Sequence, residues 1–276
     1  MKEIIGIIGA MFVEVDTLCA QLENKKTEII SGLEFNQGLL NQKEVVIVRS
    51  GVGKVNAALC VQTLINKFNV TKIINTGIAG AAGKGLGVFD FVVSTEAAYH
   101  DVDVQIFGYK IGQIPEQNQF FVADEKMADL FVKTFESTDF SKEHKIVKGR
   151  IASGDQFIAD KATKEKIIAN FAPECVEMEG AAIAHAATVN KVPFVIIRCL
   201  SDCADDSANN TYLFNEETCA KMSASLVSEF VKNIYVISLQ MKMIVQEILN
   251  DSEILGVNVI IKSFKRRNIM AQSANL

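Results

Sequence analysis

Short apolar runs recur along the chain and alternate with segments of a different hydrophobic spacing. The runs are rich in Ile and Val and mostly end in Gly, Ser, Thr or Ala: EIIGIIGA, EVVIVRSG, KIINTGIAG, DFVVSTEAA, KGRIASGD, ECVEMEG and VPFVIIRCLSD. Between several of them lie segments with helical spacing, such as VNAALCVQTLINKF and GAAIAHAATVN. Apolar strands that alternate with helices are typical of βαβ units with a sheet covered on both faces. The pattern predicts a three-layer α/β sandwich with a mostly parallel central sheet and helices on both faces.

The chain is long enough, at 276 residues with 49% hydrophobic residues, to bury a large core. It contains three prolines, no low-complexity linker and no evident repeat. We therefore expect one compact domain for the α/β pattern.

The charge and cysteine patterns exclude several classes of protein. The net charge is −5 and the Lys and Arg residues are dispersed, apart from the run KSFKRR at 262–267, so we expect no nucleic-acid partner. No apolar run reaches the roughly 18 residues of a membrane span, so we expect no membrane partner. The first segment, MKEIIGIIGAM, is interpreted as a strand rather than a signal peptide. Six cysteines without a CxxC pair suit reduced thiols in a cytoplasmic protein.

Acidic residues follow or end several of the predicted strands: Glu14, Asp155, Glu177, Glu179 and Asp202. In open α/β sheets, ligands bind outside the carboxyl ends of the strands. These acids are therefore expected to converge on one crevice.

Two of these acids, Glu177 and Glu179, are interpreted as neighbours on one face of a strand, because strand side chains alternate with a period of two. Carboxylates away from water need cations or hydroxyl and amide donors, and a vicinal diol supplies two donors. The alternative is a solvated or salt-bridged role. Arg198 and Asp202 leave one strand end and can place a cation beside an acid, either in a site or as a structural ion pair.

Other chemistries lack their motifs. GIIGAM has no third glycine of a dinucleotide fingerprint, and neither GxxxxGK[ST] nor GxSxG occurs. His100, His144 and His185 form no HExxH and no obvious ligand set, so we expect no metal and no cofactor. SGVGKVNAA either holds an anion at a helix N-terminus or is an ordinary turn.

Seven motifs together resemble the 5'-methylthioadenosine/S-adenosylhomocysteine nucleosidase family, in order and spacing from residue 1 to about Lys232. They are IIGAMxxEV, SGVGKVNAA, NTGIAG, YHDVDVQIFGYKIGQIP, SGDQFI, VEMEGAAIAHAA and RCLSDCAD. The resemblance implies a nucleoside phosphorylase-like sandwich and a homodimer. It also implies hydrolysis of the N-glycosidic bond of methylthioadenosine or S-adenosylhomocysteine to adenine and the thioribose.

The resemblance also assigns catalytic roles to individual residues. Asp202 corresponds to the general acid at N7 of the purine, and Glu14 to the base that activates water. Arg198 resembles the arginine that orients the water and the acids. Glu179 corresponds to the acceptor of the ribose hydroxyls, and Met178 packs on the sugar. We expect burial beside apolar residues to raise the pKa of Asp202, partly opposed by Arg198.

The remaining candidates are assigned to substrate binding in the same way. Phe157 stacks on adenine and the backbone of Ile158 reads its edge, while Phe214 is expected to be the aromatic lid in a stretch, ADDSANNTYLF, that is longer than usual. Phe107 and Pro115 resemble residues that reach into the neighbouring subunit's pocket. The other candidates are Met11, Ala79, Gly80, Ser201, Ala204 and Glu177, the last with a structural role as the alternative. Ile78 stands where many members carry Ser, which leaves Glu14 without that hydroxyl partner.

A purine nucleoside phosphorylase is the alternative function, with phosphate in place of water. The first loop, IGAMFVE, offers an acid and no Arg, which favours water as the nucleophile. A non-catalytic nucleoside-binding protein has no need of both Glu14 and Asp202. The preference among 5' substituents, including futalosine-type nucleosides, stays open.

The chain continues past the resemblance as an extension, so we expect a catalytic domain at 1–232 and an extension at 233–276. Val227, Phe230, Ile234, Ile237, Met241, Ile244 and Ile248 recur at spacings of three and four. This stripe predicts one long helix, which either packs on its own subunit or forms an assembly surface. The segment ILGVNVIIKSFKRR after it is expected to form a strand or to stay disordered.

Overall fold

The computed structural model describes residues 2–205 and 208–254, with the backbone only for 209, 210 and 235–254. By its internal contacts the chain consists of two units, Met1–Lys232 and Asn233–Leu276.

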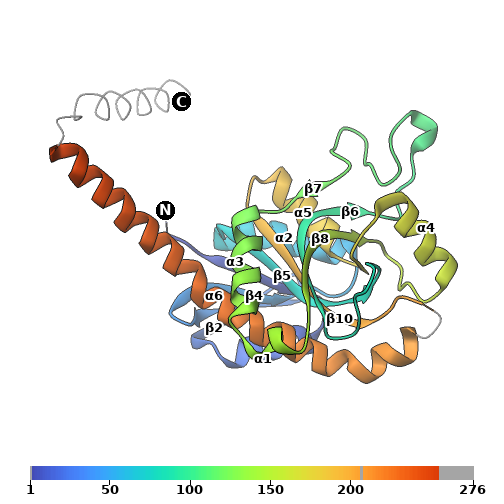
Figure 1. Cartoon of the computed structure of the whole chain (residues 1–276), viewed down its shortest axis with the longest axis horizontal. Helices are drawn as coiled ribbons and strands as arrows, with labels where there is room; N and C mark the ends of the chain where they lie inside the picture. The colour runs from blue at the N-terminus through green and yellow to red at the C-terminus, as the bar shows by residue number, and fades with distance from the viewer. Residues whose placement is uncertain (1, 206–207, 255–276) are drawn as a thin grey trace. The chain divides into compact units, whose positions relative to one another are not determined.

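The first unit is built on a single sheet of strands and a set of helices (Figure 1). The strands are β1 (Ile5–Gly9), β2 (Glu23–Ile30), β3 (Leu33–Leu40), β4 (Lys43–Arg49), β5 (Lys72–Ala81), β6 (Phe91–Tyr99), β7 (Phe121–Val122), β8 (Ile146–Ser153), β9 (Cys175–Glu177) and β10 (Phe194–Asp202). The helices are α1 (Phe12–Ala20), α2 (Lys54–Phe68), α3 (Glu125–Glu136), α4 (Lys161–Phe171), α5 (Gly180–Val189) and α6 (Ala208–Ile254), with short 3₁₀ turns at Gln105–Phe107 and Asp139–Lys142.

The strand order is β10-β6-β8-β9-β5-β1-β4-β3-β2, with β7 paired to β6. Because β10 also pairs with β5, the pairings of β10, β6, β8, β9 and β5 form a closed circuit. The pairings β1–β4, β1–β5, β5–β10, β6–β8 and β8–β9 are parallel, whereas β6–β10, β5–β9, β2–β3, β3–β4 and β6–β7 are antiparallel. The sheet is therefore mixed, and the prediction of a mostly parallel sheet is confirmed only in part.

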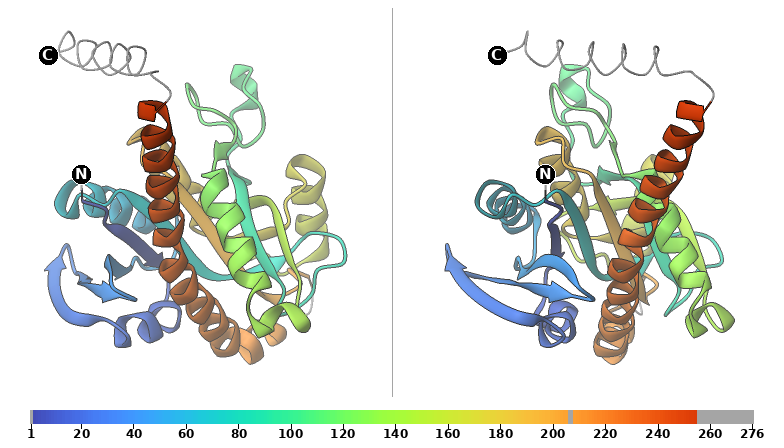
Figure 2. Two further views of the ribbon diagram at one scale, coloured as in Figure 1. Left: turned by 60° about the vertical axis from the view of Figure 1, so that its left-hand side comes forward. Right: turned by 90° about the vertical axis from the view of Figure 1, so that its left-hand side faces the viewer.

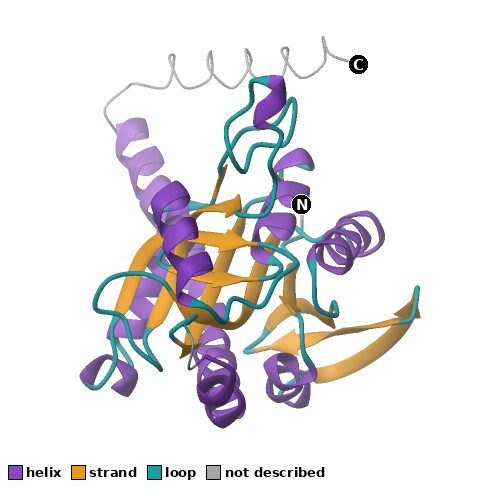
Figure 3. Cartoon of the chain, turned by 90° about the vertical axis from the view of Figure 1, so that its right-hand side faces the viewer, coloured by secondary structure: helices purple, strands orange, loops and turns teal. Residues whose placement is uncertain are grey.

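Helices cover the strands from both sides. α3 and α5 each contact β6, β8 and β10, and in Figure 1 α3 lies in front of these strands and α5 behind them. Figure 3 shows helices on both sides of the strands. Every residue of β10, and all of β5 after Lys72, is buried. Strands covered on both faces need apolar side chains on both, which explains their continuous Ile and Val runs.

All the apolar runs identified in the sequence are strands, namely β1, β4, β5, β6, β8, β9 and β10. The hairpin of β2 and β3 was missed (Figure 2). β2 has the sequence ENKKTEII and most of its residues are exposed, because it is the last strand of the sheet. Such an edge strand lacks the apolar run that identified the others.

The sixth predicted strand ends earlier than expected. β9 stops at Glu177, and Glu179 is the residue before α5, with φ −131° and ψ −36°. The prediction that Glu179 lies in the strand is wrong, and the alternation argument does not apply to it. Gly180 begins the helix that redirects the chain at this point.

The second unit begins at Asn233, within the range of α6, which runs to Ile254. Of the predicted stripe, Val227 and Phe230 are fully buried in the first unit. The side chains of Ile237, Met241, Ile244 and Ile248, and the segment 255–276 with KSFKRR, lie outside the described residues. Within the described part of the chain, no helix has the length and hydropathy required to cross a membrane.

Candidate active site

One pocket lies where the ends of β1, β5 and β10 meet the turn between β9 and α5. It encloses about 530 Å³, part of which is open to solvent. The lining residues are Ala10, Met11, Glu14, Val52, Ile78, Ala79, Gly80, Phe157, Val176, Glu177, Met178, Glu179, Ser201, Asp202 and Tyr212. A narrower recess beside it is shared with Gln156 and Ile158. Four of the five predicted acids therefore converge on one crevice, as the carboxyl-end rule requires.

Glu14 belongs to the first turn of α1 and is 4% exposed. Its carboxylate accepts hydrogen bonds from the backbone N–H groups of Ala10 (2.7 Å), Met11 (2.9 Å) and Ile78 (3.1 Å). Burial raises its pKa, against the opposing effects of Arg198 and these N–H groups. The backbone of Ile78 thus supplies a donor at the position where a serine hydroxyl is absent.

A glycine makes room for this carboxylate. A Cβ atom at Gly77 of β5 would stand 2.5 Å from Glu14 Oε1, which is far inside van der Waals contact. The glycine of the NTG sequence therefore has a steric role, which only the tertiary structure reveals.

Asp202 ends β10 and is 2% exposed. Its Oδ1 accepts from the backbone N–H of Ala204 at 2.7 Å, and its Oδ2 accepts from the Ser201 hydroxyl at 2.9 Å. Burial raises the pKa of Asp202, as predicted, but the groups that oppose the shift are Ala204, Ser201 and Lys164 rather than Arg198. Ser201 lines the pocket, whereas Ala204 supports it by holding Asp202.

Arg198 is buried behind the pocket and pairs with Glu177, not with Asp202. Its Nη2 also donates to Oδ1 of Asn75 at 2.6 Å. Glu177 accepts further bonds from the Ser153 hydroxyl and from the N–H groups of Glu179 (3.1 Å) and Gly180 (2.8 Å). Although Glu177 lines the pocket, its oxygens are committed to the protein, which favours the structural alternative.

Glu179 lines the pocket. Its Oε1 accepts from the N–H of Gly53 at 2.9 Å, and burial, followed by the charge of Glu177, raises its pKa. The next N–H, that of Lys54, donates to Asp155 at 2.8 Å. The N-terminus of α2 is therefore occupied by two carboxylates of the chain itself, and Asp155 caps this helix instead of lining the pocket.

The apolar surface of the pocket includes Met11, Phe157 and Met178, together with Ala79 and Gly80. Phe157 is 49% exposed, so its ring is available to a ligand. Ile158 is buried and belongs to the narrower recess.

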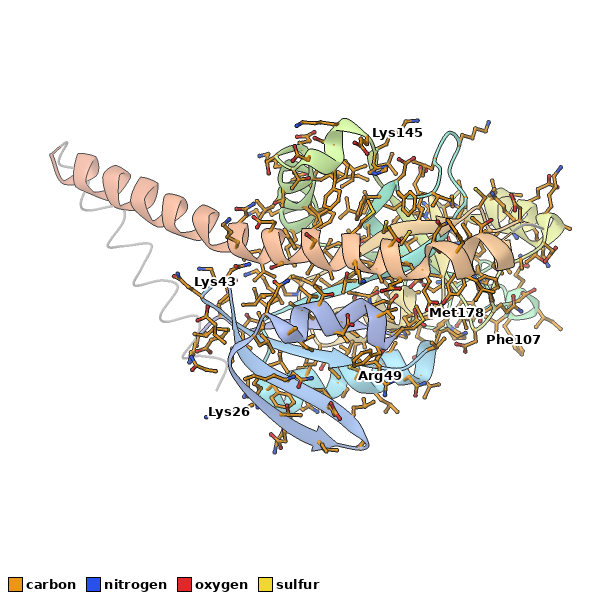
Figure 4. The ribbon with its side chains drawn as sticks, turned by 90° about the horizontal axis from the view of Figure 1, so that it is seen from below. Lys26, Lys43, Arg49, Phe107, Lys145 and Met178 are labelled. Carbon is orange, nitrogen blue, oxygen red and sulfur yellow. The ribbon has the colours of Figure 1, made fainter. Side chains whose placement is uncertain are left out.

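Three further predicted residues, Phe107, Pro115 and Phe214, line neither this pocket nor the recess beside it. Phe107 and Pro115 are both exposed and lie on the loop between β6 and β7, and Figure 4 shows Phe107 on the same side of the first unit as Met178. Phe214 is 86% exposed and is not among the residues that line the pocket.

The aromatic residue that α6 contributes is Tyr212, which the sequence analysis missed. Residues two apart on a helix point about 200° from each other, so Phe214 faces away when Tyr212 faces inward. The signal that could have found Tyr212 is its helical phase relative to Asn215 and Cys219, which are both buried.

No histidine is among the residues that line this pocket. The Tyr99 hydroxyl lies 3.3 Å from Nδ1 of His185, whose ring stacks on Phe121. Among the residues described, no group of three or more His, Cys, Asp or Glu side chains is arranged to hold a metal ion.

Comparison with known proteins identifies the family of the chain. The family described as the phosphorylase superfamily matches residues 4–232. A 5'-methylthioadenosine/S-adenosylhomocysteine nucleosidase of Psychromonas ingrahamii is 43% identical over 231 residues, which is 83% of this chain and 99% of the relative. The chain belongs to the 5'-methylthioadenosine/S-adenosylhomocysteine nucleosidase family of the phosphorylase superfamily.

Solved structures of similar proteins have the same fold. The nucleosidase of Colwellia psychrerythraea, determined in complex with adenine, is 42% identical and superposes with a TM-score of 0.81, covering 85% of this chain and 96% of that one. A futalosine hydrolase of Helicobacter pylori is 31% identical with a TM-score of 0.79, covering 84% of this chain and 98% of that one. The fold is therefore the nucleoside phosphorylase-like α/β fold that the sequence resemblance implied.

Proposed function

We propose that this chain hydrolyses the N-glycosidic bond of 5'-methylthioadenosine and S-adenosylhomocysteine, releasing adenine and the 5-thioribose product. The observation that carries the proposal is the presence of two buried carboxyl groups, Glu14 and Asp202, in the same pocket, both with a raised pKa. They stand beside Gly77 and Gly80 of β5, which are separated by roughly 10 Å along a strand. We propose that the nucleoside binds in the pocket that both carboxyl groups line.

Asp202 is proposed as the general acid. A purine is a poor leaving group until a ring nitrogen is protonated, and the transition state resembles an oxocarbenium ion. A carboxyl group with a raised pKa retains its proton closer to neutral pH. The hydrogen bonds from Ala204 and Ser201 fix its orientation toward the recess that Phe157 and Ile158 share.

Glu14 is proposed as the base that takes a proton from the attacking water. Three backbone N–H groups hold its carboxylate, and Arg198 stabilises its charged form from behind the pocket. Arg198 is itself fixed by Glu177 and Asn75. In this proposal Arg198 orients the base and its water without touching the purine.

Glu179 is proposed to accept the ribose hydroxyls. Its Oε1 is held by the N–H of Gly53, and the residue lines the pocket beside Met178, which we propose to pack on the sugar. Phe157 would then stack on adenine, with Ala79, Gly80 and the backbone of Ile158 around the base.

The phosphorylase alternative is less well supported. No Lys or Arg is among the residues that line this pocket, and the helix N-terminus beside it already holds Glu179 and Asp155. A phosphate dianion needs cations or free N–H donors. Water, which is neutral, is the nucleophile that these surroundings favour.

We also propose a homodimer that functions in the cytoplasm. Phe107 is 75% exposed, and Val55 and Leu59 of α2 are 70% and 62% exposed, near the Val52 that lines the pocket. Apolar side chains of this size are typical of a surface that another chain covers. The molecular mass in solution tests this: a monomer at micromolar concentration would contradict the dimer.

The function is tested by product analysis. Purified protein is given methylthioadenosine with and without inorganic phosphate, and adenine, methylthioribose and methylthioribose 1-phosphate are separated. We expect adenine and free methylthioribose at rates that do not depend on phosphate. Formation of the 1-phosphate only when phosphate is present would refute the hydrolase in favour of a phosphorylase.

A further inference from the structure

Tyr212 connects three parts of the pocket wall that are far apart in the sequence. Its ring meets the ring of Phe157 edge-on, with centroids 5.4 Å apart and planes at 74°. Its hydroxyl lies 3.4 Å from the sulfur of Met11. Both Phe157 and Met11 line the pocket from loops that follow different strands, so the side chain from α6 holds two otherwise separate contact residues together.

The hydroxyl is held in turn by Glu216, one helical turn further along α6. It donates to Oε1 of Glu216 at 3.1 Å. Burial and the neighbouring carboxylate of Glu216 raise the pKa of Tyr212, so the phenol keeps its proton and remains the donor. A hydroxyl has one proton to give, and a carboxylate is a stronger acceptor than a thioether. The bond to Glu216 therefore sets the rotamer in which the ring reaches Phe157 and Met11.

Phe157 depends on this contact more than a core residue would. Half of its surface is exposed, so burial alone does not fix its ring. A pocket wall that is already ordered spares an incoming ligand the cost of immobilising it. Losing the order of the wall weakens binding even when the reacting groups are unchanged.

We propose that Tyr212 is a positioning residue whose hydroxyl, held by Glu216, fixes the Phe157 and Met11 side of the pocket for substrate binding. The proposal rests on the proposed nucleosidase function and deepens it. The hydroxyl acts through its neighbours and faces neither Glu14 nor Asp202 in any hydrogen bond among the described residues. It should therefore affect KM and leave kcat nearly unchanged.

The test compares steady-state hydrolysis of methylthioadenosine by the parent protein, Tyr212→Phe, Glu216→Ala and Glu216→Gln. Tyr212→Phe keeps the ring and removes only the hydroxyl, and we expect KM to rise about fivefold, the factor that corresponds to one ordinary hydrogen bond. Glu216→Ala should raise KM equally, the double variant should add nothing, and Glu216→Gln should restore KM because its amide oxygen still accepts. The matched control is Glu217→Ala, which removes an exposed pair with Lys221 on the same helix.

The possible failures are distinguishable. Absence of turnover in the parent protein refutes the proposed function, and calorimetric binding of methylthioadenosine then makes the same comparison of variants. Turnover by the parent with an unchanged KM in Tyr212→Phe refutes only this inference. A fall in kcat at constant KM would also overturn it, because the hydroxyl would then act on the reacting atoms.

Discussion

Asp202→Asn is the substitution that isolates the proposed acid. In the parent, Oδ1 accepts from the N–H of Ala204 and Oδ2 accepts from the hydroxyl of Ser201. An asparagine can keep its oxygen at Ala204 and place its NH₂ group at Ser201, whose hydroxyl can turn to accept. The side chain therefore fits with both bonds, and we expect folding to be preserved.

The expected loss follows from what the amide cannot do. Its N–H can still form a hydrogen bond with a purine nitrogen, so KM should change little, but it has no acidic proton to transfer. Positioned general acids contribute roughly 10²- to 10⁴-fold, or about 3 to 5 kcal/mol of barrier. We therefore expect kcat to fall by about that factor.

The assay is release of adenine from saturating methylthioadenosine over a range of pH. In the parent, the acid must be protonated, so kcat should decline as pH rises through the raised pKa of Asp202. That alkaline decline should disappear in Asp202→Asn. The control is Asp129→Asn, which makes the same chemical change at a surface ion pair with Lys148. An Asp202→Asn protein that retains at least a tenth of the parent kcat would refute the assignment.

Two further substitutions test the rest of the site. Gly77→Ala should lower kcat more than tenfold while the protein still folds, because the new methyl group would stand 2.5 Å from Oε1 of Glu14 and displace the base. The control is Gly87→Ala, whose new methyl group meets nothing within 4 Å. Equal kcat values for the two variants would contradict the role of Glu14. Glu179→Gln should weaken binding yet raise the melting temperature, by more at about pH 8 than at about pH 5. The reason is that burial raises the folded-state pKa of Glu179 above its ordinary 4.5, so the carboxyl group ionises at lower pH in the unfolded chain than in the folded protein. The free energy of unfolding therefore falls as pH rises from 4.5 to the folded-state pKa. Glutamine does not ionise and so removes this loss, while its amide oxygen still accepts from the N–H of Gly53. Melting curves that shift in parallel at both pH values would count against this linkage.

Much of the fold could be read from the sequence, because buried strands leave a continuous apolar signal. The strands that carry the site, β1, β5, β9 and β10, were all located in this way. The edge strand β2 was not, since its exposed residues leave no such signal. The antiparallel pairings β5–β9 and β6–β10 were also missed, because an apolar run does not record the direction of its neighbour.

The sequence predicted several residues that line the pocket, but not which residues they pair with. Glu14, Asp202 and Glu179 were identified from their places near strand ends and from motif resemblance, and all three line the pocket. The prediction that Arg198 acts on Asp202 was wrong, because Glu177 rather than Asp202 lies against its guanidinium group. Position along a strand does not determine which acid reaches across to a buried cation.

The choice between Tyr212 and Phe214 shows the same limit at the level of one helix. Both are aromatic, they are two residues apart, and only the rotation of α6 about its axis decides which one faces Met11 and Phe157. The sequence by itself determined where the apolar strands lie along the chain, which acids stand near their ends, and the family. The tertiary structure alone decided which carboxylates are bonded within the protein and which face the pocket, because those distinctions depend on contacts between separate segments of the chain, such as Arg198 with Glu177 and Gly53 with Glu179.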